Sequence, residues 1–218
     1  MGFCWFAEFD AAAPAGLAAA LAGVAGMARA LIHTPAATHD PYLDDGAPPA
    51  LVLQLYFDEI AALEAAIAPG GRLAALPGLA RQQAMLVRPF AVPDARLRTA
   101  SGAPHCTYLV AYQGVAENLD AWLSHYIAHH PPIMARFPAI RAIEIATRID
   151  WCGGPPAARV THMQRNKVVF DSADALTAAL NSPVRHEMRA DFQNFPSFTG
   201  PTTHFPMLTR SLPEDGLP

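Results

Sequence analysis

Apolar strands and amphipathic helices alternate along the chain, and their order is the same in both halves. An aromatic run opens each half, a helical stretch follows it, and a short apolar run closes the half. The predicted pairs, first half before second, are the strands 3–9 and 106–112, the helices 14–26 and 117–129, and the strands 84–90 and 204–208. The pattern predicts two related units of about 100 residues each.

The clearest feature that the halves share is a strand-to-helix corner. Phe57-Asp58-Glu59-Ile60-Ala61-Ala62-Leu63 has a counterpart in Phe170-Asp171-Ser172-Ala173-Asp174-Ala175-Leu176, 113 residues later. Each segment follows an apolar run and carries an Asp or Ser suited to cap the N-terminus of the helix. With the flanking strands, each half reads β-α-β-β-α-β.

This order is the ferredoxin-like pattern, in which four antiparallel strands carry two helices on one face and leave the other face bare. Two bare faces cover one another when they pack together. We therefore predict an α+β fold in which two ferredoxin-like (βαββαβ) repeats pack sheet to sheet as an intramolecular barrel. The first repeat spans 1–95, a linker spans 96–104, and 105–218 holds the second repeat with a C-terminal tail.

Composition narrows the classes of partner. The chain is 52% hydrophobic with a net charge of -4 and a single lysine, Lys167, so no basic stripe is available for nucleic acid. The three cysteines form neither a pair nor a metal-ligand spacing, which fits a reducing cytoplasm. The apolar stretch 11–32 contains Arg29 and lacks a basic flank, so we interpret it as a buried helix running into a strand and predict no membrane segment.

One predicted helix directs a histidine toward the core. Its apolar residues recur at helical spacing from Glu117 onward, at Leu119, Trp122, Leu123, Tyr126 and Ile127. On a helical projection His130 falls about 20° from Leu119, inside this stripe, whereas His125 and His129 point away from it. The two prolines that follow His130 are predicted to end the helix.

The strand predicted over 140–151 is polar on one face only. Alternation in this strand and in the strand ending at Phe170 places five polar side chains toward the barrel interior, namely Glu144, Arg148, Asp150, Arg165 and Lys167. His162 and His204 also fall on predicted strands, where they could face the barrel. The sequence thus predicts a polar cavity in the second half.

A resemblance to a known family covers about residues 105 to 210. The segment His130-Pro131-Pro132-Ile133-Met134-Ala135-Arg136-Phe137-Pro138-Ala139-Ile140 resembles the EthD-like pattern of a helix ending in His-x-Pro-Leu, then a spacer and Pro-Gly-Leu, with Ala139 in place of the usual Gly. The run 168–176 is similar to that family's strand-to-helix corner, and Ser182-Pro183 with Asp191-Phe192 continues it. The first half lacks a His-x-Pro segment at the position where one would be expected.

EthD-like proteins belong to the dimeric α+β barrel superfamily, so the resemblance implies that fold, here as a tandem chain with a degenerate first half. Members of the superfamily include polyketide cyclases, lactone isomerases, haem-degrading monooxygenases and dehydratases, beside many proteins with no assigned activity. What they share is a pocket between sheet and helices and not a reaction. The fold alone does not settle the function.

The candidate general acid or base is His130, because an imidazole titrates near neutral pH and an inward position brings it to a pocket wall. The alternative is a helix-terminal histidine that bonds the last carbonyls. Arg148 and Glu144 are the other catalytic candidates, and substrate contacts are predicted from Tyr126, Asp150, Arg165 and Lys167. His125 and His129 are four residues apart but read as a solvated pair, so no metal site is predicted.

Three hypotheses of different classes follow. The first is a cofactor-independent isomerase, cyclase or dehydratase that acts on a hydrophobic small molecule, with His130 transferring a proton. The second is a binding or accessory protein with the same pocket and no chemistry. The third is a haem or oxygen-dependent monooxygenase with a histidine ligand. Pairing of the two-repeat chain into a homodimer is left open.

Overall fold

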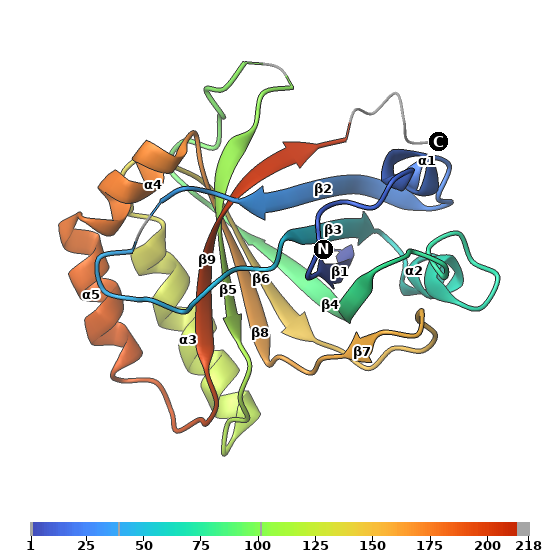
Figure 1. The fold of residues 1–218 in the computed structure, drawn as a ribbon. Helices are drawn as coiled ribbons and strands as arrows, with labels where there is room; N and C mark the ends of the chain where they lie inside the picture. Colours follow the sequence, from blue (N-terminus) through green and yellow to red (C-terminus); the bar gives the residue numbers. More distant parts are fainter. Residues whose placement is uncertain (1, 39, 101, 213–218) are drawn as a thin grey trace.

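The structure, a computed structural model, describes residues 2–38, 40–100 and 102–212; the predicted C-terminal tail past these lies outside the described residues. The first half contains β1 (Gly2–Phe9), α1 (Leu17–Leu21), β2 (Met27–Pro35), β3 (Leu51–Phe57), α2 (Ile60–Ile67) and β4 (Leu79–Phe90). The second contains β5 (His105–Tyr112), α3 (Leu119–Met134), β6 (Ile140–Arg148), β7 (Ala158–Arg159), β8 (Gln164–Phe170), α4 (Ala173–Leu180), α5 (Pro183–Phe192) and β9 (Thr202–Ser211). In Figure 1 the strands gather at the centre, with α3, α4 and α5 on one side and α1 and α2 on the other.

Eight strands form a closed antiparallel barrel in the order β1-β3-β2-β9-β5-β8-β6-β4, and β4 pairs back to β1. Strands of the two halves meet at two seams. One joins β2 to β9, with Leu31 opposite Ser211, and the other joins β4 to β6, with Met85 opposite Arg148. The short β7 adds a parallel pairing to β4 outside the ring. Closure gives each of the eight strands a partner on both sides, which removes the exposed edges of an open sheet.

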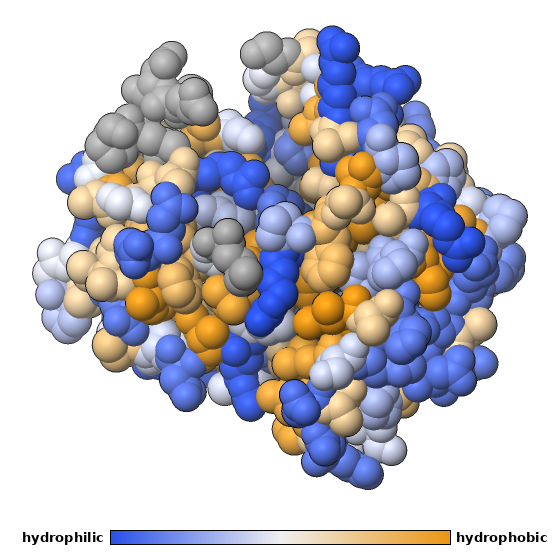
Figure 2. Space-filling view, turned by 180° about the vertical axis from the view of Figure 1, so that it is seen from behind, coloured by the Kyte–Doolittle hydropathy of each residue, from blue (hydrophilic) through white to orange (hydrophobic). Residues whose placement is uncertain are grey.

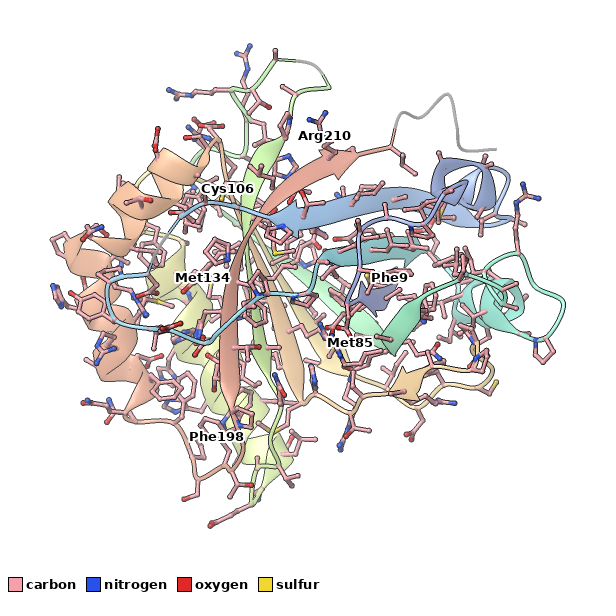
Figure 3. All side chains as sticks on the ribbon, in the orientation of Figure 1. Phe9, Met85, Cys106, Met134, Phe198 and Arg210 are labelled. Carbon is pink, nitrogen blue, oxygen red and sulfur yellow. The ribbon has the colours of Figure 1, made fainter. Side chains whose placement is uncertain are left out.

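Alternation along the strands separates the barrel interior from two outer cores. The core of the first half packs under α1 and α2 around Trp5, Leu53 and Leu63, and that of the second packs under α3, α4 and α5 around Trp122 and Ile145. A smaller apolar cluster fills part of the interior, with Cys4, Phe6, Leu31, Met85 and Met207 among its buried members. Figure 3 shows Met134 on the α3 side of the sheet and Met85 among the barrel strands.

The first helix is shorter than its predicted range of 14–26. The helix α1 covers only Leu17–Leu21, since Gly16 and Gly23, with φ of 79° and 68°, take left-handed conformations on its two sides. Within the described ranges, no helix is long and apolar enough to cross a bilayer.

The prediction that two prolines end the third helix is wrong. Helix α3 includes Pro131 and Pro132 and continues to Met134. The fixed φ of proline fits a helix, and the carbonyl of Pro131 still accepts a hydrogen bond from the backbone N–H of Ala135 at 2.9 Å. The resulting extra turn keeps His130 inside a regular helix, where it is 5% exposed.

The connection between β6 and β8 is long. Strand β6 ends at Arg148, before the predicted end of the strand at 151, and Gly153-Gly154-Pro155-Pro156 is part of an excursion over 149–163 that contains β7. The excursion is held on the first half, because Gln82 on β4 donates to the carbonyl of Pro155 at 2.7 Å. It therefore forms part of the rim at one end of the barrel.

Residues 36–38 and 40–50, between β2 and β3, form a strap that crosses from the first half to the helical side of the second; Figure 1 shows it in blue in front of β9. Asp40 anchors the strap and is 5% exposed. Its carboxylate accepts from Tyr108 at 2.7 Å and from Arg185 at 2.9 Å. Farther along, Asp45 accepts from His204 at 2.8 Å.

Removal of the strap's buried anchor should destabilise the protein. We expect Asp40→Ala to lower the free energy of unfolding by about 3 kcal/mol, because a buried cation loses its counter-charge. Asp44→Ala changes an exposed carboxylate of the same strap and should cost no more than about 0.5 kcal/mol. Urea unfolding followed by circular dichroism measures both, and equal losses in the two variants would contradict an anchoring role for Asp40.

Candidate functional site

One end of the barrel contains a cavity of about 300 Å³. Its apolar wall comes mainly from Phe6 on β1, Val52 on β3, Leu109 on β5, and Phe205 and Met207 on β9. The strap covers part of it with Ala47, Pro48 and Pro49. A cavity of this size, mostly apolar with a few convergent polar groups, is typical of small-molecule sites. We call it the barrel-end cavity.

Four charged side chains form a network in the wall of the barrel-end cavity. The carboxylate of Glu8 accepts from Arg165 at 2.7 Å and from Arg81 at 2.8 Å, and Arg81 also pairs with Asp10 at 2.6 Å. These residues come from β8, β4 and the end of β1, so closure of the barrel is what brings them together. Gln83 on β4 extends the network by donating to the carbonyl of His162 at 2.9 Å.

The network keeps Glu8 ionised. Burial by itself would raise the pKa of this carboxyl, but the charge of Arg165 and the hydrogen bonds from both arginines outweigh burial and lower the pKa to about 2. Two carboxylates and two guanidinium groups then balance one another. The wall of the cavity carries four charges with a formal sum of zero.

Among the described residues, His162 is the one histidine that lines the barrel-end cavity. It lies two residues before β8 and is 9% exposed. Burial, together with the charge of Arg165, lowers the pKa of its imidazole to about 3, so the ring is neutral at physiological pH. Its Nδ1 is buried and has no hydrogen-bond partner among the described residues. A neutral imidazole has one donor and one acceptor nitrogen, so the ring is suited to exchange a hydrogen bond with a bound molecule.

The opposite end of the barrel is closed by a second polar cluster. Glu144 accepts from Lys167 at 2.7 Å, from Tyr56 at 2.6 Å and from Arg29 at 2.9 Å. Arg29 also lies over the ring of Tyr56, 3.9 Å from its centroid. Burial lowers the pKa of Lys167 to about 8, against the opposing effect of Glu144. Because these hydrogen bonds join the four residues to one another, we call the cluster a plug; a surface pocket of about 250 Å³ lies against Arg29, Tyr56 and Glu144.

A third polar group lies on the outer face of the sheet, in a pocket beneath α3, α4 and α5. Nδ1 of His130 is 2.6 Å from the carboxylate of Asp191 on α5. Burial lowers the pKa of His130 to about 4 despite Asp191, so the ring is neutral and donates to the carboxylate. The pocket is small, about 40 Å³. We call it the helix–sheet pocket.

The predicted site residues therefore fall into four places. Arg165 lines the barrel-end cavity, and Glu144 and Lys167 lie in the plug at the other end. His130 lies on the far side of the sheet, near Tyr126, whose hydroxyl accepts from Asn166 at 2.7 Å. The sheet separates His130 from the polar residues of the barrel interior. These residues therefore do not form the single site that the sequence predicted.

The remaining two predicted residues are at the surface. Arg148 and Asp150 are exposed and line a groove beside Gln83, because β6 ends at Arg148 and the chain leaves the barrel wall after it. His204 does not face the interior either; it lies on the outward side of β9 and lines the helix–sheet pocket. His162 does face the barrel.

Glu8 and Arg81 were not predicted as site residues. Glu8 is the one charged residue in the otherwise apolar run 3–9, a signal that was present in the sequence. Arg81 lies before the predicted start of its strand, so alternation along that strand did not assign its side chain to a face of the sheet. Their approach to Arg165 depends on pairing between strands far apart in the chain, which periodicity does not reveal.

Neither cavity suits a haem. A haem is larger than the 300 Å³ of the barrel-end cavity and far larger than the 40 Å³ of the helix–sheet pocket, so neither His162 nor His130 has room for a haem beside it. Across the ranges that the structure describes, no three His, Cys, Asp or Glu side chains are arranged to hold a metal.

Acid titration should reveal the Glu8 network. Because the folded pKa is lowered from 4.5 to about 2, the stabilisation is present above pH 4.5 and is lost as the pH falls toward 2. Glu8→Gln should cost roughly 3 kcal/mol at neutral pH, and its difference from wild type should shrink across this window. Unfolding measured at several pH values tests this, with the exposed Glu59→Gln as control. A difference that stays constant down to the acid limit would refute the network.

Comparison with known proteins supports the fold. No family model and no curated protein sequence matches the chain. Solved structures do match: an anthrone oxidase-like protein has a TM-score of 0.60 and 13% identity, with 96% of this chain and 93% of that one covered. A putative monooxygenase from Fusobacterium nucleatum has a TM-score of 0.56 and 8% identity, with 96% and 91% covered.

A mutant chlorite dismutase from Candidatus Nitrospira defluvii also matches, with a TM-score of 0.50 and 11% identity over 94% of this chain and 90% of that one. At such low identity the likeness concerns the fold and not the reaction. The described residues have a mixed α+β fold with a closed eight-stranded antiparallel barrel and five helices, and these solved structures share that fold.

Proposed function

We propose that the protein binds a largely apolar small molecule in the barrel-end cavity and transfers a proton to or from it. The observation that carries this proposal is the combination, in one cavity of about 300 Å³, of an apolar wall, a balanced ion network and a neutral histidine. The cavity is the larger of the two that combine apolar walls with a buried histidine.

In this proposal His162 is the general acid or base. Its neutral ring accepts a proton from an acidic C–H or O–H of the ligand and returns it at another position, which is the chemistry of an isomerase, cyclase or dehydratase. Arg165 lines the same cavity, so its guanidinium can donate a hydrogen bond to a ligand oxygen, and Glu8 fixes the orientation of that guanidinium at 2.7 Å. No step requires a cofactor.

A second candidate is proton transfer by His130 in the helix–sheet pocket. The 2.6 Å bond to Asp191 favours it, because a carboxylate that fixes one ring nitrogen leaves the other to act as a base. The volume of about 40 Å³ counts against it, since an aromatic substrate would enter only if the strap or α5 moved. The monooxygenase names of the matched structures suggest an oxygen-dependent variant of either site.

We also propose that the chain is a tandem of ferredoxin-like repeats related to the EthD-like family, with the boundaries 1–95 and 105–218. The strand order supports this, because β4-β1-β3-β2 in the first half and β9-β5-β8-β6 in the second are the same arrangement. The corresponding helix in the first half lacks a histidine, so both candidate bases belong to the second repeat.

Filling each cavity in turn tells the candidates apart. Ala111→Phe places a ring in the barrel-end cavity, and Leu180→Phe enlarges a side chain in the helix–sheet pocket. Compounds that raise the melting temperature of wild type should fail to stabilise Ala111→Phe and should still stabilise Leu180→Phe. Circular dichroism confirms that both variants fold, since overpacking costs about 1–3 kcal/mol. The reverse pattern would reject the barrel-end cavity and favour His130.

A further inference from the structure

We infer that the ligand of the barrel-end cavity is an uncharged molecule of about two fused rings that carries a hydroxyl directed at His162. This inference rests on the proposed function and specifies its substrate class. It follows from the charge balance of the cavity wall, from the cavity's size and lining, and from the ring of His162.

The charge balance excludes a charged ligand. Each carboxylate oxygen of Glu8 already accepts from a guanidinium, and the Arg81 guanidinium is shared with Asp10. A carboxylate or an ammonium group brought into this space would lose its hydration and find no unpaired counter-charge. An uncharged ligand leaves the network intact.

Size and lining set the shape of the ligand. A cavity of about 150 Å³ is known to hold one benzene ring, so about 300 Å³ accommodates roughly two. Most of the wall is apolar, with the aromatic rings of Phe6 and Phe205 and the flexible side chain of Met207. Flat fused rings gain the most contact with such a surface.

The imidazole of His162 determines which polar group the ligand should carry. It is neutral and 9% exposed, and among the described residues no side chain or backbone group bonds either ring nitrogen. A neutral imidazole has one donor and one acceptor nitrogen. A hydroxyl both donates and accepts, so it suits whichever nitrogen faces the cavity, and it also provides the proton that the proposed chemistry moves.

Calorimetric titration of the full chain with four probes of one size tests the inference: 2-naphthol, naphthalene, 2-naphthoate and 2-naphthylmethylammonium. We expect 2-naphthol to bind at least tenfold more tightly than either ion and several-fold more tightly than naphthalene. His162→Leu should bring 2-naphthol to the affinity of naphthalene. Binding of either ion as tight as that of 2-naphthol would overturn the uncharged class, and equal affinity of naphthalene and 2-naphthol would overturn the hydroxyl.

A charge-altered variant provides an independent check. Glu8→Gln leaves an excess positive charge in the wall, so its affinity for 2-naphthoate should rise at least tenfold; the exposed Asp44→Asn, outside the cavity, should leave it unchanged. No rise in a folded Glu8→Gln would overturn the charge argument. If none of the four probes binds wild type, the proposed function itself fails, which is distinct from binding by the wrong class of probe.

Discussion

Closure of the barrel through its two seams is the constraint on which the rest of the structure depends. Where β2 meets β9 and β4 meets β6, backbone hydrogen bonds join the halves and leave the eight inner faces directed at one another. Space inside such a ring is limited, so each inward residue needs a partner from a strand that is distant in sequence. The apolar cluster around Met85 and Met207 meets this need in the middle.

At both ends of the barrel the inward residues pair with polar side chains, but the two ends differ. At one end Glu144, Lys167, Tyr56 and Arg29 bond to one another and close the barrel. At the other, the ions of the Glu8 network lie in the wall and leave a cavity beside them. Breaking a buried ion pair is costly, but the intact pair contributes little net stability relative to apolar residues, because desolvation opposes its attraction. The position of the Glu8 network beside a cavity is consistent with the proposed ligand site.

The surface agrees with a site that lies inside the molecule. Figure 2, seen from behind, shows hydrophobic residues gathered in the middle of the face and interspersed with hydrophilic ones. The strap and the 149–163 excursion cover openings that the sheet and helices alone would leave. Both segments connect strands and extend onto neighbouring elements, so access to either cavity depends on loops and not on the rigid barrel.

Periodicity predicted the strands and which way many of their side chains point. Val168 and Phe170 face the helices and Arg165 and Lys167 face inward, as alternation required, because a buried face fixes strand register. Periodicity did not reveal that His130 and Arg165 lie on opposite sides of the sheet, because the pattern of a helix and the pattern of a strand do not show which face of the sheet the helix covers. Nor did it reveal Asp40 as an anchor, because a loop has no period from which contacts can be inferred.

The central claim, that the ligand lies inside the barrel, is tested most directly by NMR of ¹³C-labelled methionine methyl groups during titration with 2-naphthol. Met207 lines the barrel-end cavity, whereas Met134 and Met188 line the helix–sheet pocket. The account predicts that the Met207 methyl signal shifts with ligand while the other two stay in place. Shifts of Met134 and Met188 with an unmoved Met207 signal would contradict it.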